Sequence, residues 1–285
     1  MPVLKRVASI YAYRELLINL VRKELKVKYK DSALGFFWSL LNPALLLVVY
    51  YVVFQLILGS GIPLFPLWLL SGLLVWNLFS TALSTGTASI VANSALVKKV
   101  SFPREVLPLA SVGAALMHFF FQTVVLFGAL GLSGHGVAWR YVALIPIALV
   151  VLLVLSAALA ILLSAINVSL RDTQHLLELV LLTWFWATPI VYRWGLLHDK
   201  FATKGWPDWL VLINPVTPIV LLFQRALYNR TSFVGPDGVR QIMVPSSSVG
   251  VYLLWLMIVL AASLVLLAGA IKVFDRTEGS FAEEL

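Results

Sequence analysis

Basic side chains near the start of the chain have types and a spacing suited to binding anionic phosphate groups. Arginine can meet a phosphate through two parallel N–H donors, whereas lysine acts as a point charge. The stretch from Tyr11 to Leu34 reads YAYRELLINLVRKELKVKYKDSAL. The four candidate phosphate-binding residues in it are Arg14, Arg22, Lys26 and Lys28. If they meet only the phosphates of surrounding lipid, they serve as membrane anchors and recognise nothing.

The element that must position these cations is an amphipathic helix over residues 10–31. Plotted at about 100° per residue, the segment has a polar strip and an opposite apolar face. Such a helix lies in the headgroup layer of a membrane. Arg14 and Lys28 fall within the apolar arc, where Lys28 can pair with Glu24 at i, i+4. Arg14 then needs another partner, which could be lipid phosphate, a second protein or an anionic cargo.

The composition places the chain in a membrane. Apolar residues make up 61% of it and charged residues 12%, about half the charged share of a soluble domain. Eight of the 21 lysines and arginines precede residue 31, so topology explains the net charge of +8 better than nucleic-acid binding does. The chain has no cysteine, which excludes disulfides and thiolate metal sites. The N-terminus does not resemble a cleavable signal peptide, so we expect the first span to be retained.

The hydropathy pattern predicts an all-α integral membrane protein with six transmembrane helices, because a span needs about 20 apolar residues. The expected spans are 34–58, 65–89, 106–132, 141–166, 174–193 and 249–273. Basic residues in the loops after spans two and four, together with the basic N-terminus, place both termini and these two loops in the cytoplasm. The long connection 194–248 would lie outside. Its apolar part is interrupted by Pro215 and Pro218, which favours short interfacial or re-entrant helices.

Two sets of residues expected of other membrane proteins are missing from the sequence. No GxxxxGK[ST] motif occurs, so the chain has no P-loop of its own, and we expect ATP to be hydrolysed by a separate subunit. Ion-coupled carriers place ionisable groups at mid-membrane, and only His118 and Glu178 approach that position. We expect no catalytic residue and no metal site. The candidates in the outer connection are scattered without suitable spacing: His198, Asp199, Asp208 and Asp237.

Two cytoplasmic loops have the form of docking surfaces. In residues 91–105, VANSALVKKVSFPRE, Asn93 or Ser94 could cap a short basic helix that Pro103 ends. A plain basic loop is an equally good interpretation of this stretch. In residues 167–173, NVSLRDT, Asp172 could cap the fifth span while Arg171 stays at the interface.

These segments resemble the permease subunit of ABC-2-type polysaccharide exporters. The resemblance extends over essentially the whole chain, which would form one domain, 1–285. The sequence contains no internal repeat. The matching segments are KVKYKDSALGFFWSLLNP at 26–43, NSALVKKVSFPREVLPL at 93–109, NVSLRDT at 167–173, TPIVY at 188–192 and NPVTPIV at 214–220.

The resemblance implies a homodimer in the bacterial cytoplasmic membrane, joined by two copies of a nucleotide-binding subunit that holds ATP and Mg²⁺. No cofactor would be bound by this chain. Its cargo would be a polyprenyl-pyrophosphate-linked glycan of O-antigen, teichoic acid or galactan type. Residues 10–31 would form a gate helix, 91–103 a coupling helix, and 196–225 the outer mouth. The residues implied in ATPase coupling are Asn93, Lys98, Lys99, Phe102, Arg104, Arg171 and Asp172.

Aromatic rings in a glycan channel would stack on the apolar faces of sugars. The candidates for pore-facing rings are Tyr51, Trp184 and Tyr192, although each could instead belong to an interfacial aromatic belt or to internal packing. Two rival functions remain from the sequence: an ABC-2 exporter of a drug or lipid, and a membrane-embedded envelope enzyme or scaffold. The missing catalytic cluster disfavours the second.

Overall fold

A computed structural model describes residues 3–29, 37–57, 59, 62–235 and 238–285. The predicted amphipathic helix is divided in two. Helix α1 (Val3–Ala12) and helix α2 (Arg14–Tyr29) meet at Tyr13, where the backbone makes a turn, while residues 30 and 31 of the predicted helix lie outside the described residues. Helix α2 packs on α6 (Val106–Ser133), where Gly113 leaves room for Val21: a Cβ on that glycine would lie 2.8 Å from the valine.

Among the residues that the structure describes, five helices are long and apolar enough to cross a membrane, whereas six spans were predicted. They are α3 (Trp38–Tyr50) with its π-helical continuation η2 (Tyr51–Ile57), α4 (Phe65–Ala92), α6, α8 (Ile145–Ser169) with the preceding α7 (Trp139–Val142), and α13 (Val249–Thr277).

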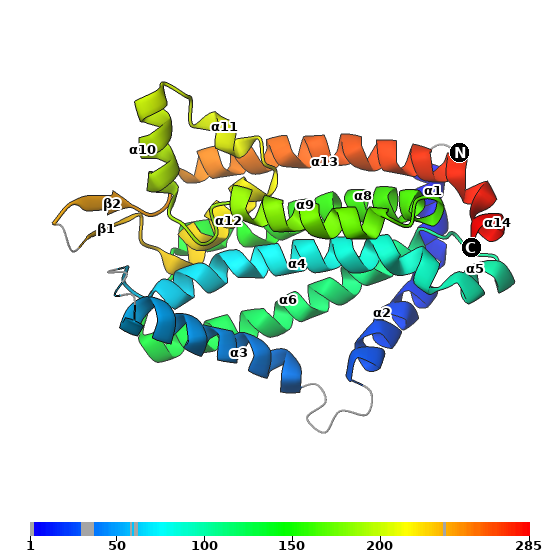
Figure 1. Ribbon diagram of the computed structural model, residues 1–285, viewed down its shortest axis with the longest axis horizontal. Helices are drawn as coiled ribbons and strands as arrows, with labels where there is room; N and C mark the ends of the chain where they lie inside the picture. The colour runs from blue at the N-terminus through cyan, green and yellow to red at the C-terminus, as the bar shows by residue number, and fades with distance from the viewer. Residues whose placement is uncertain (1–2, 30–36, 58, 60–61, 236–237) are drawn as a thin grey trace.

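The predicted fifth span, 174–193, is wrong in its length. It corresponds to α9 (Thr173–Ala187), which has 15 residues and ends where Thr188 becomes extended just before Pro189. Fifteen residues rise only about 22 Å, less than the roughly 30 Å hydrocarbon core. Helix α9 runs beside α4 toward the end of the molecule that carries α10 (Figure 1).

Helix α4 is the centre of the fold, because 78% of the residues in an apolar stretch of 18 within it are buried. It packs against α6 and α8, and against α12 (Val216–Phe223) with its π-helical continuation η3 (Gln224–Tyr228). Small residues permit this close approach: a Cβ on Gly86 would lie 2.7 Å from the Cβ of Ala160, and one on Gly72 would lie 2.9 Å from Nε2 of Gln224. The core therefore consists of helices that could not separate without exposing most of α4.

The connection 194–248 contains short helices, as predicted, but also a β-hairpin. Helices α10 (Trp194–Lys204) and α11 (Trp209–Leu212) precede α12, which is buried against α4 and α8 and so is not a surface helix of this chain. Strands β1 (Ser232–Val234) and β2 (Arg240–Ile242) pair antiparallel with Phe233 opposite Gln241. The all-α prediction missed these strands because three-residue strands show too few alternations to be recognised.

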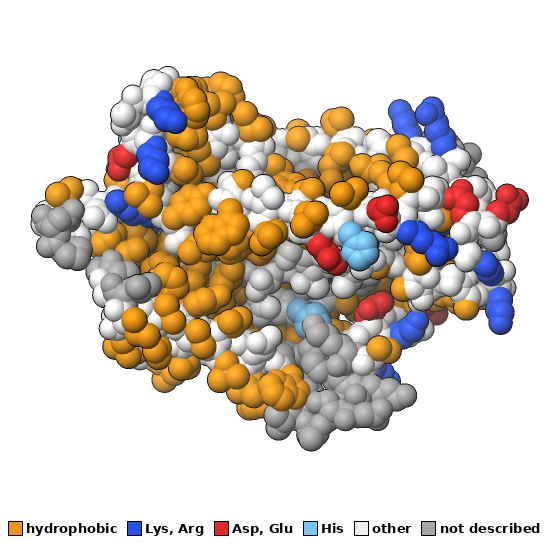
Figure 2. Space-filling view, in the orientation of Figure 1, with side chains coloured by type: hydrophobic (Ala, Val, Ile, Leu, Met, Phe, Trp, Pro, Cys, Tyr) orange, Lys and Arg blue, Asp and Glu red, His pale blue; other side chains and the backbone are white. Residues whose placement is uncertain are grey.

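Both termini lie at the end of the molecule opposite α10, α11 and the hairpin (Figure 1). This end also holds α5 (Ser94–Lys99), the short η4 (Glu278–Ser280) and α14 (Phe281–Glu284). Figure 2 shows most of the lysines and arginines visible in that view at this end, with a smaller group over α10. We call it the terminal face, defined as α1, α5, the start of α6, the last turns of α13, η4 and α14.

Candidate functional site

The terminal face is built on a second, smaller apolar core. Val97 of α5, Phe102 of the following loop, Phe274 of α13 and Phe281 of α14 are all buried in it. The rings of Phe274 and Phe281 meet edge to face, 5.3 Å apart. Helix α5 is therefore fixed to the chain's C-terminal end as well as to its own neighbours α4 and α6.

Helix α5 is shorter than the predicted helix 91–103 and ends at Lys99, where Val100 turns extended. It directs its charge outward. Lys98 and Lys99 are exposed, and neither forms an ion pair within the described part of the chain. Phe102, by contrast, is only 7% exposed and serves as an apolar anchor of the loop. Of the predicted coupling residues in this loop, the two lysines alone present a free docking surface.

Asn93 stands at the N-cap position of α5, but its side chain does not cap that helix, contrary to the prediction. Its Nδ2 donates to the backbone oxygen of Ser89 at 2.8 Å instead. Its Oδ1 accepts from Nζ of Lys23, on α2, at 2.9 Å. Asn93 thus ties the predicted gate helix to the junction between α4 and α5.

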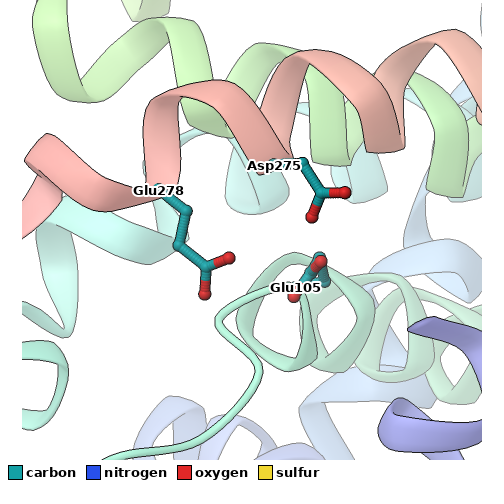
Figure 3. Close-up of side chains that lie close together, drawn as sticks. All are labelled: Glu105, Asp275 and Glu278. Carbon is teal, nitrogen blue, oxygen red and sulfur yellow. The ribbon is translucent and has the colours of Figure 1, made fainter. Parts of the chain in front are cut away.

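A charged cluster around Arg6 joins α1 to the start of α6 and the end of α13. The guanidinium of Arg6 donates to Glu105 and Glu278, and its Nη1 lies 2.9 Å from Oδ1 of Asp275. The carboxylates of Glu105, just before α6, Asp275 in the last turn of α13 and Glu278 in η4 lie close together (Figure 3). Glu105 is completely buried, whereas the side chain of Arg6 is 13% exposed. One cation from α1 therefore neutralises acids that would otherwise repel each other.

The three carboxylates are close enough to be considered as metal ligands, since their oxygens lie within 4.8 Å of one another. The donor set does not fit a resident metal ion, because the guanidinium of Arg6 already forms an ion pair with all three. Burial raises the pKa of Glu105, against the opposing effect of Arg6. The carboxylates in turn raise the pKa of Arg6 above its ordinary value, despite its burial.

Arg104 also turns toward the C-terminal end and away from solvent. Its Nη1 donates to the backbone oxygen of Glu278, and its guanidinium lies 5.8 Å from the ring centre of Phe281. Ser169, the last residue of α8, donates to the carboxylate of Glu284, which lowers the pKa of that exposed acid. The predicted contact of Arg104 with an ATPase stays a prediction, and within the chain this half-buried residue contacts η4 and α14.

Comparison with known proteins identifies the family. A family described as "ABC-2 type transporter" matches residues 15–228. A protein of Myxococcus xanthus named "O-antigen export system permease protein RfbA" is 34% identical over 283 residues, covering 99% of this chain and all of the relative. Two Klebsiella pneumoniae proteins of the same name are each 30% identical, over 215 and 217 residues, covering 75% and 76% of this chain and 81% and 82% of the relatives. The chain belongs to the ABC-2 transporter family. It is a multi-pass membrane permease and not an enzyme.

The four predicted phosphate-binding residues of this ABC-2 permease all lie on α2. Arg14, Arg22 and Lys26 are exposed, and the guanidinium of Arg14 lies 5.2 Å from the ring centre of Tyr11. Lys28 belongs to α2, but its side chain lies outside the described residues, so the predicted pair with Glu24 does as well. Glu24 lines a cavity of about 180 Å³ between α2, α4 and α6 together with His118. The exposed cations remain available to an anion.

The second predicted coupling loop leaves its charges exposed. Arg171 and Asp172 both face solvent, and Asp172 occupies the N-cap position of α9 without a side-chain capping bond, contrary to the prediction. Thr173 instead donates from Oγ1 to the backbone oxygen of Leu170 at 2.6 Å.

The three predicted pore aromatics of the permease have different environments. Trp184 is held inside the chain, since its Nε1 donates to Asn214 at 2.8 Å and its ring meets Phe79 edge to face. Tyr192 donates from its hydroxyl to the backbone oxygen of Trp186 at 2.9 Å. Tyr51 is 51% exposed and lines an apolar cavity of about 270 Å³ on the α3 side of the molecule. Tyr51 is the best placed of the three to meet a ligand.

Sequence reasoning missed the cluster around Arg6. In the sequence Glu105 is simply the last residue of the basic stretch 91–105, and no motif contains Arg6, Asp275 or Glu278. The membrane side of these residues could have predicted the cluster. Arg6 lies within the basic N-terminal segment and the three acids border two spans, so all four belong to the same side of the membrane. Which acid meets which base depends on the packing of α1, which the pattern does not specify.

Proposed function

We propose that this permease moves a polyprenyl-pyrophosphate-linked polysaccharide outward, driven by ATP hydrolysis in a separate nucleotide-binding subunit. The observation that carries the proposal is the form of α5. Its two lysines face away from the fold, while its other side contacts α14 and contributes Val97 to the apolar core that Phe274 of α13 shares. A push on α5 would therefore be delivered to the membrane helices and not lost within a loop.

Two connections would carry that movement to the gate. Asn93 links α5 to α2 through Lys23, and Arg6 links α1 to α6 and α13. Helix α2 offers the exposed Arg22 and Lys26 on the same side of the molecule. These cations can bind a pyrophosphate at the interface, where Arg gives paired donors and Lys a point charge. The terminal face would then be cytoplasmic, in keeping with its excess of basic residues.

A second copy of the chain would complete the path. Helix α9 presents a row of apolar side chains away from its own fold, and such a row needs lipid or protein to cover it. The exposed members are Leu176, Leu179, Val180, Leu182 and Trp186. The relatives named for O-antigen export support a glycan cargo, and a polymer needs a wider passage than one bundle of this size encloses.

The test is reconstitution of the full chain with the nucleotide-binding subunit of an ABC exporter from the same organism, in lipid, with and without a polyprenyl-linked glycan. We expect a stable complex whose ATPase activity rises with that substrate. A complex that responds to a drug or free lipid but not to the glycan would transfer the assignment to that cargo. Failure to form any complex would contradict an ATP-driven exporter altogether.

Charge reversal on α5 separates docking from cargo recognition. We expect Lys98→Glu with Lys99→Glu to abolish glycan-stimulated ATPase activity, because the two exposed cations proposed to dock on the ATPase would become anions. The matched control is Arg276→Glu, an exposed residue in the last turn of α13 on the same face. Equal activity of the α5 variant and the wild type would remove α5 from the coupling route.

A further inference from the structure

A second cationic site lies at the end of the molecule opposite the terminal face. There a cavity of about 630 Å³ opens between α7, η3 and the start of α13. It is lined by two arginines, two aromatic rings and the first residues of α13: Ala138, Trp139, Arg140, Tyr141, Arg225, Ser248, Val249 and Gly250. None of these residues was singled out for a function by the sequence, by the family or by the names of the relatives.

The two arginines bring positive charge that the neighbouring protein does not neutralise. The guanidinium of Arg225 stacks 4.3 Å from the ring centre of Tyr141, and its Nη1 donates to Asn229 at 3.1 Å. Its Nε is buried and has no hydrogen-bond partner among the described residues. Arg140 is exposed, and no described acid pairs with either arginine. The lining of the cavity therefore holds two guanidinium groups, with no described carboxylate paired to either of them, and this charge favours an anion.

The walls of the cavity are fixed by hydrogen bonds between its three elements. The backbone nitrogen of Ala138 donates to the oxygen of Ala226 in η3 at 2.8 Å. The hydroxyl of Tyr141 donates to the oxygen of Ser247, just before α13, at 2.9 Å. Val249 and Gly250 contribute the first turn of a 29-residue helix, whose amides and dipole favour negative charge. The site is therefore preformed, and its local field matches an anion.

The position of the cavity identifies the kind of anion. It lies where two candidate spans begin, Trp139–Ser169 and Val249–Ser280. Trp139 is 76% exposed at this level, as expected for a ring in the headgroup layer. At that depth phosphate groups belong to lipids, whose apolar chains can lie along the exposed side chains of α13 below the cavity. Leu254 and Ile258 of α13 are both more than half exposed.

We propose that Arg140 and Arg225 bind the phosphate group of an anionic lipid at the membrane face opposite the termini. Arg225 supplies the oriented donors and Arg140 a second, exposed charge, while Trp139 borders the headgroup. The lipid could be a resident phospholipid or a polyprenyl phosphate, since both offer the same group. The inference does not rest on glycan export, because lipid retention is measured without ATP, cargo or the nucleotide-binding subunit.

The experiment is native mass spectrometry of the full chain released from nanodiscs of phosphatidylcholine that contain a minor share of phosphatidylglycerol. We expect the wild type to retain phosphatidylglycerol, and Arg140→Gln with Arg225→Gln to retain it about tenfold less for each charged hydrogen bond removed. The matched control is Arg230→Gln, which removes an exposed arginine from the same end of the chain but not from the cavity. Because Arg225 also packs on Tyr141, the single exposed change Arg140→Gln carries the test if the double variant does not fold.

Two further arms distinguish the sources of the phosphate. In one, undecaprenyl phosphate replaces phosphatidylglycerol, and preferential retention of either lipid identifies the occupant. In the other, inorganic phosphate is added at the same concentration as the anionic lipid. Complete displacement by inorganic phosphate would overturn a lipid site. Equal retention by wild type and variants, or an equal loss in Arg230→Gln, would also overturn it.

Discussion

Replacing Arg6 with methionine should release α1 from the terminal face. The side chain of Arg6 pairs with the carboxylates of Glu105, Asp275 and Glu278, and methionine has a similar length without charge. If α1 stays packed on the terminal face in this variant, the completely buried carboxylate of Glu105 has lost the guanidinium that donates to it. Breaking a buried ion pair from one side costs about 3–5 kcal/mol.

Protonation limits that cost at neutral pH. A glutamate of ordinary pKa can be neutralised at pH 7 for at most about 4 kcal/mol, since each pH unit above the pKa contributes about 1.4 kcal/mol. In the variant, the free energy needed to open α1 should therefore fall by about 3 kcal/mol at pH 7. The loss should shrink to about 1 kcal/mol near pH 5, where less work is needed to protonate Glu105.

The sign of this pH dependence follows from the direction of the shift. Burial raises the folded-state pKa of Glu105, and removing Arg6 takes away an influence that lowers it. A group with a raised folded pKa contributes stability that is complete below its unfolded pKa and is lost as the pH rises through the folded pKa. The variant should thus be closest to wild type in acid and furthest from it above neutrality.

Amide hydrogen exchange of the segment 3–12 measures the opening of α1 directly. A loss of about 3 kcal/mol corresponds to roughly hundredfold faster exchange at pH 7, with no change in the buried helix α4. Adding Glu105→Gln to Arg6→Met should restore part of the protection, because the buried charge is gone. Arg276→Met, an exposed change on the same face, is the control. Exchange at the wild-type rate in Arg6→Met, or no rescue by Glu105→Gln, would refute the reasoning.

Three smaller perturbations test the packing that surrounds the site. Gly86→Ala would place its Cβ 2.7 Å from that of Ala160. We expect the free energy of unfolding to fall by about 1–3 kcal/mol and the melting temperature to fall with it. An unchanged melting temperature would mean that α4 and α8 separate easily. Asn93→Ala removes the acceptor of Lys23, and we expect weaker coupling of ATP hydrolysis to export with little change in melting temperature; fully coupled turnover would remove this link from the route. Tyr228→Phe removes a buried hydroxyl that donates to a backbone oxygen before α4 at 2.6 Å, and should cost about 1 kcal/mol in thermal unfolding.

The pattern of the sequence was sufficient for most of the membrane elements, because long apolar runs have few alternative structures. It predicted the starts of α4, α6, α8 and α13 to within a few residues. It failed at the fifth span, where apolar residues continue to Tyr192 but the helix stops at Ala187. Hydropathy counts such residues alike, whereas the extended backbone at Thr188 depends on Pro189 and on the hydrogen bond from Asn214 to the threonine hydroxyl.

The candidate site was predictable in composition but not in its contacts. The family resemblance pointed to α5 and α2, and both lie on the same side of the molecule. Neither proposed cap formed, because Asn93 and Asp172 begin helices from backbone conformations outside the extended region that a side-chain cap normally uses. The inward turn of Arg104 depends on Phe281, which is far along the chain and is brought near only by packing.

The two ends of the molecule use arginine in different ways, and the difference bears on how movement could be coupled. At the terminal face Arg6 is saturated by three acids, so it fastens α1 and has little capacity for a ligand. At the opposite end Arg225 lines an open cavity and forms no ion pair with a described acid. Helix α13 joins the two, with Asp275 near its end and Val249 at its start. A shift of α13 that loosens the Arg6 cluster would also move one wall of the cavity. Lipid binding at the far end and the attachment of α1 should therefore be coupled, and exchange of the segment 3–12 in nanodiscs with and without phosphatidylglycerol measures that coupling. A rate that does not depend on the lipid would show the two ends to be independent.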